Sequence, residues 1–220
     1  MELPRLTYFG SRGRAELTRL TCALAGISYE ERSVGTWDPT NLPDGFLALR
    51  REGALAFEQL PMWEEPGGLR LVQSDAIVRH LARTAGLYGH GAREMARVDE
   101  VLEGVKDVRA EFAKLAPAPP EARPALRATL GDHTTPRWLG FFDRLLARNE
   151  GAFGFVGHGP TVADVALYQW IEALRDNGFF PADPSRWPRV LGLESRLMAI
   201  PRFNAYVSGG GRHPVQLLPR

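Results

Sequence analysis

The sequence has a single cysteine, Cys22, among its 220 residues. An internal disulfide needs two cysteines, so the disulfide-rich secreted folds are excluded. Cys22 lies among Leu20, Ala23 and Leu24 in the middle of a helix-like run, away from a helix N-terminus that would lower its pKa. We therefore expect a buried, unreactive thiol rather than a catalytic or redox-active one.

Long apolar runs and an excess of charge of one sign are also missing. No apolar stretch approaches the roughly 20 residues of a membrane-spanning helix, and residues 1–5 lack the basic and apolar regions of a signal peptide. The 27 basic and 26 acidic residues leave a formal net charge of +1, which gives no electrostatic basis for binding nucleic acid or a membrane surface. These features predict a cytoplasmic protein that binds a small ligand.

Histidine is scarce, and its spacing is uninformative. The five histidines, at positions 80, 90, 133, 158 and 213, include no pair at metal-ligand spacing. No glycine loop carries the lysine of a phosphate-binding motif. The sequence therefore predicts neither a metal nor a nucleotide cofactor.

The residues that are present predict an α/β domain over residues 1–85. Strand-like and helix-like runs alternate there in the order βαβ followed by ββα. One helix is marked by Leu17, Leu20 and Leu24, and Gly26 ends it. The expected strands cover 3–9, 28–34, 60–64 and 69–72, and the expected helices cover 14–25, 46–51 and 74–85.

The rest of the chain has the pattern of an all-helical domain. Residues 86–91 are glycine-rich and predict a linker. Beyond them, Val101, Val105 and Phe112 recur on one face of a long helix. Three later groups of apolar residues predict further helices around 138–146, 163–174 and 191–200. We therefore place an all-α domain over residues 92–220.

Three features of the first domain are candidates for binding or chemistry. Tyr8 ends the first strand just before a glycine-bearing loop, where α/β sheets present ligand groups, although a packed aromatic would also suit that position. Pro61 opens a short strand and, if cis, would leave the backbone of Leu60 free to pair with an extended peptide ligand; the alternative is an ordinary trans proline. Ser74 has the chemistry of a helix N-cap beside a ligand carboxylate, or of a cap alone.

Short stretches in both halves of the chain carry a resemblance to a known family. In the first half they are Leu6-Thr7-Tyr8-Phe9, Arg12-Gly13-Arg14-Ala15-Glu16, Trp37, Gln59-Leu60-Pro61, Leu71-Val72-Gln73-Ser74-Asp75 and Gly86-Leu87-Tyr88-Gly89. In the helical half they are Val98-Asp99, Gly104-Val105-Lys106-Asp107 and the capping box Thr161-Val162-Ala163-Asp164. In this order and spacing they resemble the cytosolic glutathione transferases, in particular the tyrosine-type group of alpha, mu, pi and sigma classes.

The resemblance implies a thioredoxin-like domain with the glutathione site, an all-helical domain that completes the electrophile site, and a homodimer. It implies that glutathione is the co-substrate and that Tyr8 donates a hydrogen bond to the glutathione sulfur, with Arg14 organising the site. Phe57 would be the aromatic key inserted into the partner subunit. The implied glutathione-binding residues are Trp37, Arg51 (or its neighbour Arg50), Gln59, Leu60, cis Pro61, Gln73, Ser74 and, from the partner subunit, Asp107.

Two other functions remain compatible with the sequence. A glutathione-dependent isomerase of the sigma type would use the same thiolate on another substrate. A catalytically silent relative would keep the fold as a binding protein, but usually loses the glutathione residues, whereas Tyr8, Gln73 and Ser74 are present here. We therefore expect a glutathione transferase acting on small apolar electrophiles.

Overall fold

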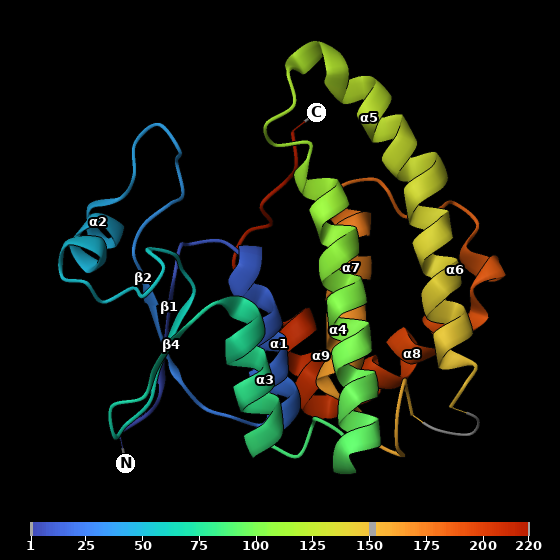
Figure 1. Ribbon diagram of the computed structural model, residues 1–220, viewed down its shortest axis with the longest axis horizontal. Helices are drawn as coiled ribbons and strands as arrows, with labels where there is room; N and C mark the ends of the chain where they lie inside the picture. Colours follow the sequence, from blue (N-terminus) through green and yellow to red (C-terminus); the bar gives the residue numbers. More distant parts are fainter. Residues whose placement is uncertain (1, 150–152, 220) are drawn as a thin grey trace. The chain divides into compact units, whose positions relative to one another are not determined.

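The computed structural model describes residues 2–149 and 153–219, and the chain forms two compact units (Figure 1). The first unit contains the residues up to Ala85 together with Arg202–Gln216, and the second contains Gly86–Pro201 and the residues from Leu217 onward. The segment Arg202–Gln216, which the sequence analysis assigned to the helical domain, packs within the first unit, where Phe203 is fully buried.

The first unit is built on a four-stranded mixed sheet. Its strands lie in the order β2-β1-β3-β4, with β1 parallel to β2 and antiparallel to β3. Leu6 of the central strand is opposite Glu31 on one side and Trp63 on the other. The strands are β1 (Arg5–Tyr8), β2 (Glu30–Ser33), β3 (Met62–Glu64) and β4 (Arg70–Val72).

Helices cover both faces of this sheet, with α1 and α3 side by side on one face and α2 on the other (Figure 1). The leucines that predicted the first helix are buried in α1, and Gly26, with φ of 72°, terminates it in the left-handed conformation. The order βαβ followed by ββα gives the thioredoxin-like arrangement expected from the sequence. The helices are α1 (Glu16–Ala25), α2 (Asp44–Arg51), α3 (Ser74–Thr84) and, near the C-terminus, α9 (Pro201–Ser208).

The second unit is helical, as predicted. Val101, Val105 and Phe112 are buried along one face of α4, which packs against α7. The residues of α7 itself are buried on nearly all sides of the helix, which is typical of a central helix. The helices are α4 (Gly91–Ala113), α5 (Arg123–Thr129), α6 (Thr135–Leu146), α7 (Val162–Asp176) and α8 (Pro188–Met198). In the described part of the chain, none of these helices combines the length and apolarity that a bilayer crossing requires.

The capping box predicted at the start of α7 is present, and its acidic residue is fully buried. One carboxylate oxygen of Asp164 accepts hydrogen bonds from the Thr161 backbone N–H (2.7 Å) and hydroxyl (2.8 Å). The other accepts from the backbone N–H of Phe155 at 3.0 Å. Burial outweighs these hydrogen bonds and raises the pKa of Asp164 to about 6. The residue therefore joins the start of α7 to the preceding loop.

Candidate active site

Tyr8 is held at the end of β1 by the loop that follows it. Its side chain is only 6% exposed, and its hydroxyl oxygen accepts a hydrogen bond from the backbone N–H of Arg14 at 3.0 Å. Gly13 makes this contact possible, because a Cβ atom there would lie 2.5 Å from the Tyr8 hydroxyl oxygen and the residue has a φ of +41°. The loop thus fixes the direction in which the hydroxyl can donate its own proton.

The surroundings of Tyr8 keep it neutral. Burial raises the pKa of Tyr8 above its ordinary value, although the Arg14 N–H and the charges of Arg14 and Arg19 act in the opposite direction. The phenol therefore keeps its proton at neutral pH. A lone pair of the hydroxyl oxygen accepts the Arg14 N–H, so the hydroxyl can donate its own proton to a nearby anion. This arrangement suits a hydrogen-bond donor and not a general base.

Trp37 is joined to the same region through an aromatic chain. Phe9, the residue after Tyr8, makes edge-to-face contacts with Trp37 (ring centroids 5.1 Å apart) and with Phe46 of α2 (5.3 Å). Trp37 remains 41% exposed, so part of it is accessible to a ligand. A large apolar surface fixed in position and still accessible is a suitable contact for a ligand.

The two arginines at the end of α2 have different surroundings. The Arg50 Nε donates a hydrogen bond of 2.9 Å to the Glu58 carboxylate. Arg51 is exposed at the last position of the helix. Of the two, Arg51 is therefore the better candidate for a ligand carboxylate.

Gln59, Leu60 and Gln73 come together at one end of β3. The Leu60–Pro61 peptide bond is cis, as the resemblance implied. Leu60 is buried, and the Gln73 side-chain amide donates to the Gln59 side-chain oxygen at 3.3 Å. Among the described non-glycine residues, Glu58 (φ 52°) and Gln73 (φ 75°) have positive φ, and such strained residues concentrate at ligand sites.

The N-cap prediction for Ser74 is wrong. Ser74 is the first residue of α3, and Gln73 occupies the N-cap position. The chain turns into the helix through the positive φ of Gln73, and the cap lies one residue earlier than the serine pattern indicates. Ser74 still lies at the helix N-terminus, next to the Gln59–Gln73 pair.

Sequence comparison identifies the protein family. The N-terminal domain model of glutathione S-transferase matches residues 4–83, and a C-terminal domain model of the same family matches residues 106–209. Glutathione S-transferase A2 of Bos taurus is 32% identical over 212 residues, covering 95% of this chain and 89% of the relative. The chain belongs to the glutathione S-transferase family. This confirms the family, the fold and the class of enzyme that the sequence predicted.

Other glutathione S-transferases give the same result. Glutathione S-transferase A1 of Homo sapiens is 31% identical, covering 95% of this chain and 90% of the relative. A crystal structure of a C. elegans nematode glutathione S-transferase superposes with a TM-score of 0.78 and 29% identity, covering 97% of this chain and all of that one. The similarity therefore extends over both units of this glutathione S-transferase.

Two of the implied residues are exposed. Asp107 is exposed on α4, in the second unit. Phe57 is 65% exposed in the turn before Gln59, an unusual position for a large aromatic side chain. Both were expected to meet a partner subunit, and their assignment remains a prediction.

Three residues that support Tyr8 were not singled out from the sequence. Phe9 contacts the Tyr8 ring, and Gly13 leaves room for the Tyr8 hydroxyl. Arg19 donates a hydrogen bond to the loop that follows Tyr8. Arg19 had a signal, because a charged residue three positions after Glu16 lies on a helix face that is otherwise apolar. Gly13 had none beyond its place in a glycine-bearing loop.

Cys22 is not part of this transferase's site. Its side chain is fully buried in α1, and burial raises the pKa of the thiol to about 12. The prediction of a buried thiol is confirmed, and its raised pKa agrees with the expectation that it is unreactive.

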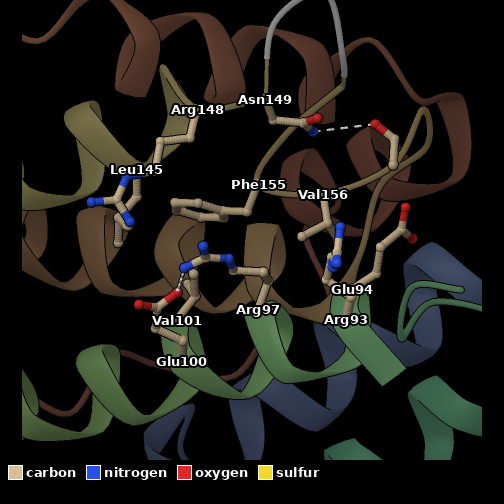
Figure 2. A pocket seen from close by; sticks show the side chains of 11 residues that line it. Arg93, Glu94, Arg97, Glu100, Val101, Leu145, Arg148, Asn149, Phe155 and Val156 are labelled. Carbon is tan, nitrogen blue, oxygen red and sulfur yellow. Dashed lines mark hydrogen bonds and ion pairs between the residues drawn. The ribbon is translucent and has the colours of Figure 1, made fainter. Parts of the chain in front are cut away.

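A cavity of about 210 Å³ lies in the second unit, between α4, α6 and residues 155–157 (Figure 2). Figure 2 shows Phe155 pointing into it and Arg97 turned toward Glu100, with which it forms a 2.6 Å ion pair. None of the site residues predicted from the sequence lies among its described lining residues. Among residues 2–149 and 153–219, no group of three or more histidine, cysteine or acidic side chains is arranged to hold a metal ion.

Proposed function

We propose that this enzyme conjugates the glutathione thiolate to small apolar electrophiles, and that the Tyr8 hydroxyl stabilises the thiolate by donating a hydrogen bond to the sulfur. The observation that carries this proposal is the Arg14 N–H contact with the Tyr8 oxygen at 3.0 Å, which orients a neutral, buried phenol and leaves its proton free to donate. Family membership supplies the co-substrate.

The energetics fit this role. A free thiol with a pKa of about 8.5 is only a few per cent ionised at pH 7, and the thiolate is the nucleophile. A hydrogen bond to a charged acceptor contributes about 1.5 to 3 kcal/mol, which lowers the pKa of the thiol by about one to two units. That change makes the thiolate a major species at neutral pH.

The other residues of the first unit would bind the tripeptide. We assign the cysteinyl backbone to Leu60 next to cis Pro61, because Leu60 lies just before β3 and outside its ladder, where an extended peptide can pair with the backbone. Gln73 and Ser74 would hold the γ-glutamyl end at the N-terminus of α3, where free N–H groups favour a carboxylate. Gln59 supports Gln73 through their mutual hydrogen bond.

The positively charged and aromatic residues complete this assignment. Trp37 and Arg51 would contact the glycyl end, because one is an exposed ring and the other an exposed guanidinium. Arg14 would favour the thiolate electrostatically, since its charge already acts on the pKa of Tyr8.

Dimerisation would be part of this function. A homodimer would bury the exposed ring of Phe57 in the partner subunit and bring Asp107 of one subunit to the γ-glutamyl amine in the other. We also propose that the enzyme acts in the cytoplasm, the location expected in the sequence analysis.

We expect Phe57→Ala to weaken the dimer at least about thirtyfold, the effect of losing an interface anchor worth about 2 kcal/mol. Sedimentation velocity across a concentration series measures the dissociation constant. Leu69→Ala is the matched control, because Leu69 is an apolar side chain of the same unit that is 40% exposed. Equal dissociation constants for Phe57→Ala and wild type would remove Phe57 from the interface.

The function is tested by measuring glutathione binding and the conjugation of a chlorodinitrobenzene-type electrophile with the wild-type protein. We expect binding together with saturable conjugation, because that reaction needs only a thiolate and an apolar pocket. Binding without conjugation of any small electrophile would favour an isomerase, which needs a shaped pocket for its substrate. Failure to bind glutathione would indicate that the protein is a catalytically silent relative.

A further inference from the structure

We propose that the C-terminal segment Arg212–Pro214 positions the loop between β1 and α1, which holds the Tyr8 hydroxyl. Arg212 is then a positioning residue for Tyr8, although it contacts neither Tyr8 nor the substrate. This inference rests on the proposed role of Tyr8. It follows from a buried chain of ion pairs and hydrogen bonds inside the first unit, which links residues about 200 positions apart in the sequence.

The chain begins at the loop between β1 and α1. This loop supplies the Arg14 N–H that holds the Tyr8 hydroxyl. Two of its carbonyl groups, those of Ser11 and Arg12, both accept hydrogen bonds of 3.1 Å from one nitrogen of the Arg19 guanidinium. Arg19 is 1% exposed, and its guanidinium carbon lies 5.9 Å from the centroid of the Tyr8 ring. Arg19 therefore fixes the loop through the carbonyl groups of Ser11 and Arg12.

Arg19 is held in turn by two carboxylates. Glu16, also 1% exposed, lies 3.1 Å from the Arg19 guanidinium, and Glu31 of β2 accepts from the Arg19 Nε at 2.9 Å. A buried arginine needs such partners, because an uncompensated charge in the interior is strongly unfavourable. The position of Glu16 thus decides the position of Arg19.

The C-terminal segment determines where Glu16 lies. The carboxylate oxygen that Arg19 does not contact accepts hydrogen bonds from Arg212, at 2.7 and 3.1 Å, and from the Tyr206 hydroxyl at 3.0 Å. The Arg212 side chain is only 6% exposed. Glu16 therefore lies between Arg19 and Arg212. These three side chains are buried, and Glu31, whose side chain is 26% exposed, completes a charge-balanced group of two arginines and two glutamates.

A second connection runs through the backbone. The Arg12 backbone N–H donates to the Pro214 carbonyl and the Arg12 Nε to the His213 carbonyl, both at 3.0 Å. The His213 ring lies 2.9 Å from Glu31, the other partner of Arg19. The loop is therefore fixed on one side by Arg19 and on the other by the backbone of the C-terminal segment. Loss of either connection frees the loop that orients the Tyr8 hydroxyl.

Arg212→Gln tests this proposal. It removes the charge that faces Glu16, and we expect kcat to fall about fivefold to twentyfold while the KM for glutathione changes less than about threefold, because positioning acts on the thiolate and not on tripeptide binding. The pKa of the bound glutathione thiol, read from thiolate absorbance, should rise by about half a unit to one unit. Arg212→Lys should recover part of both losses.

Three further variants separate positioning from a general loss of structure. Arg202→Gln, an exposed arginine of the same segment, should leave kcat and thiol pKa at wild-type values. The double variant Tyr8→Phe/Arg212→Gln should be no slower than Tyr8→Phe alone, since Arg212 acts through Tyr8. Tyr206→Phe removes only one hydrogen bond to Glu16, and it tests the proposal if Arg212→Gln does not fold. It should lower kcat by about twofold to fivefold.

The outcomes distinguish this proposal from the proposed function. If Tyr8→Phe raises the thiol pKa while folded Arg212→Gln or Tyr206→Phe leaves it unchanged, Tyr8 is the donor and positioning by the C-terminal segment is overturned. A rate loss for the double variant equal to the product of the two single losses would also overturn it. If Tyr8→Phe itself leaves the thiol pKa unchanged, the proposed function fails and this inference fails with it.

Discussion

Tyr8→Phe is expected to lower the rate of glutathione conjugation by about 10- to 100-fold at neutral pH while leaving glutathione bound. The substitution removes the proposed hydrogen bond to a charged acceptor, worth about 1.5 to 3 kcal/mol, and also the acceptor of the Arg14 backbone N–H. Phenylalanine keeps the ring and its edge contact with Phe9, whose centroid is 5.3 Å away, so the loss is confined to the hydroxyl. Steady-state rates and glutathione affinity measured in parallel test the expectation.

The pH dependence of this loss makes the test sharper. If Tyr8 lowers the pKa of the thiol, as proposed, its advantage is largest where free glutathione is protonated and shrinks once the pH exceeds the free thiol pKa of about 8.5. We therefore expect the ratio of wild-type to variant rates to decrease as the pH rises from 6.5 to about 9. A ratio independent of pH would mean that Tyr8 acts on another step.

Tyr88→Phe is the matched control for this experiment. Tyr88 is a buried tyrosine whose hydroxyl donates to Asp99 in the second unit. Its loss should affect stability and leave the pH dependence of conjugation unchanged. An equal rate loss in both variants would indicate general destabilisation rather than loss of a hydrogen-bond donor.

Asp164→Ala is expected to lower the free energy of unfolding by about 3 to 5 kcal/mol, because it leaves the buried backbone N–H groups of Thr161 and Phe155 without their acceptor. Urea unfolding followed by circular dichroism measures the change. Asp44→Ala is the control, since Asp44 is also an acidic residue in the first turn of a helix but is exposed. A loss below about 1 kcal/mol for Asp164→Ala would contradict the structural role.

The raised pKa of Asp164 also predicts how stability varies with pH. Its pKa is about 6 in the folded protein and close to the ordinary aspartate value of 3.8 in the unfolded chain, so the folded state binds more protons between these values. The contribution of this group is fully present below pH of about 4 and is lost as the pH rises through 6. The stability difference between wild type and Asp164→Ala should therefore be larger at pH 4.5 than at pH 7. A difference that grows with pH would show that burial does not dominate.

The sequence predicted those parts of the fold that depend on local patterns. The apolar face of α4 and the capping box of α7 follow from residues three to four positions apart, and Gly26 ends α1 where its sequence position indicated. The site residues followed from the resemblance to a family, because a lone tyrosine or proline has no distinctive local pattern. Cis Pro61 is an example, since its identity alone favours the trans form.

What the sequence did not predict depends on distant contacts or on single torsion angles. The helix cap lies at Gln73 and not at Ser74 because Gln73 has a positive φ, which no propensity favours for glutamine. The association of Arg212 with Glu16 joins positions 196 residues apart. No spacing rule covers such a pair, and residues 202–216 were therefore assigned to the helical domain.

The most direct test of the account is a pH titration of thiolate absorbance for glutathione bound to the wild-type enzyme and to Tyr8→Phe. If Tyr8 donates to the sulfur, the bound thiol titrates about one to two units below free glutathione in the wild type and returns close to the free value in the variant. Equal pKa values for the thiol bound to the two proteins would contradict the central role assigned to Tyr8.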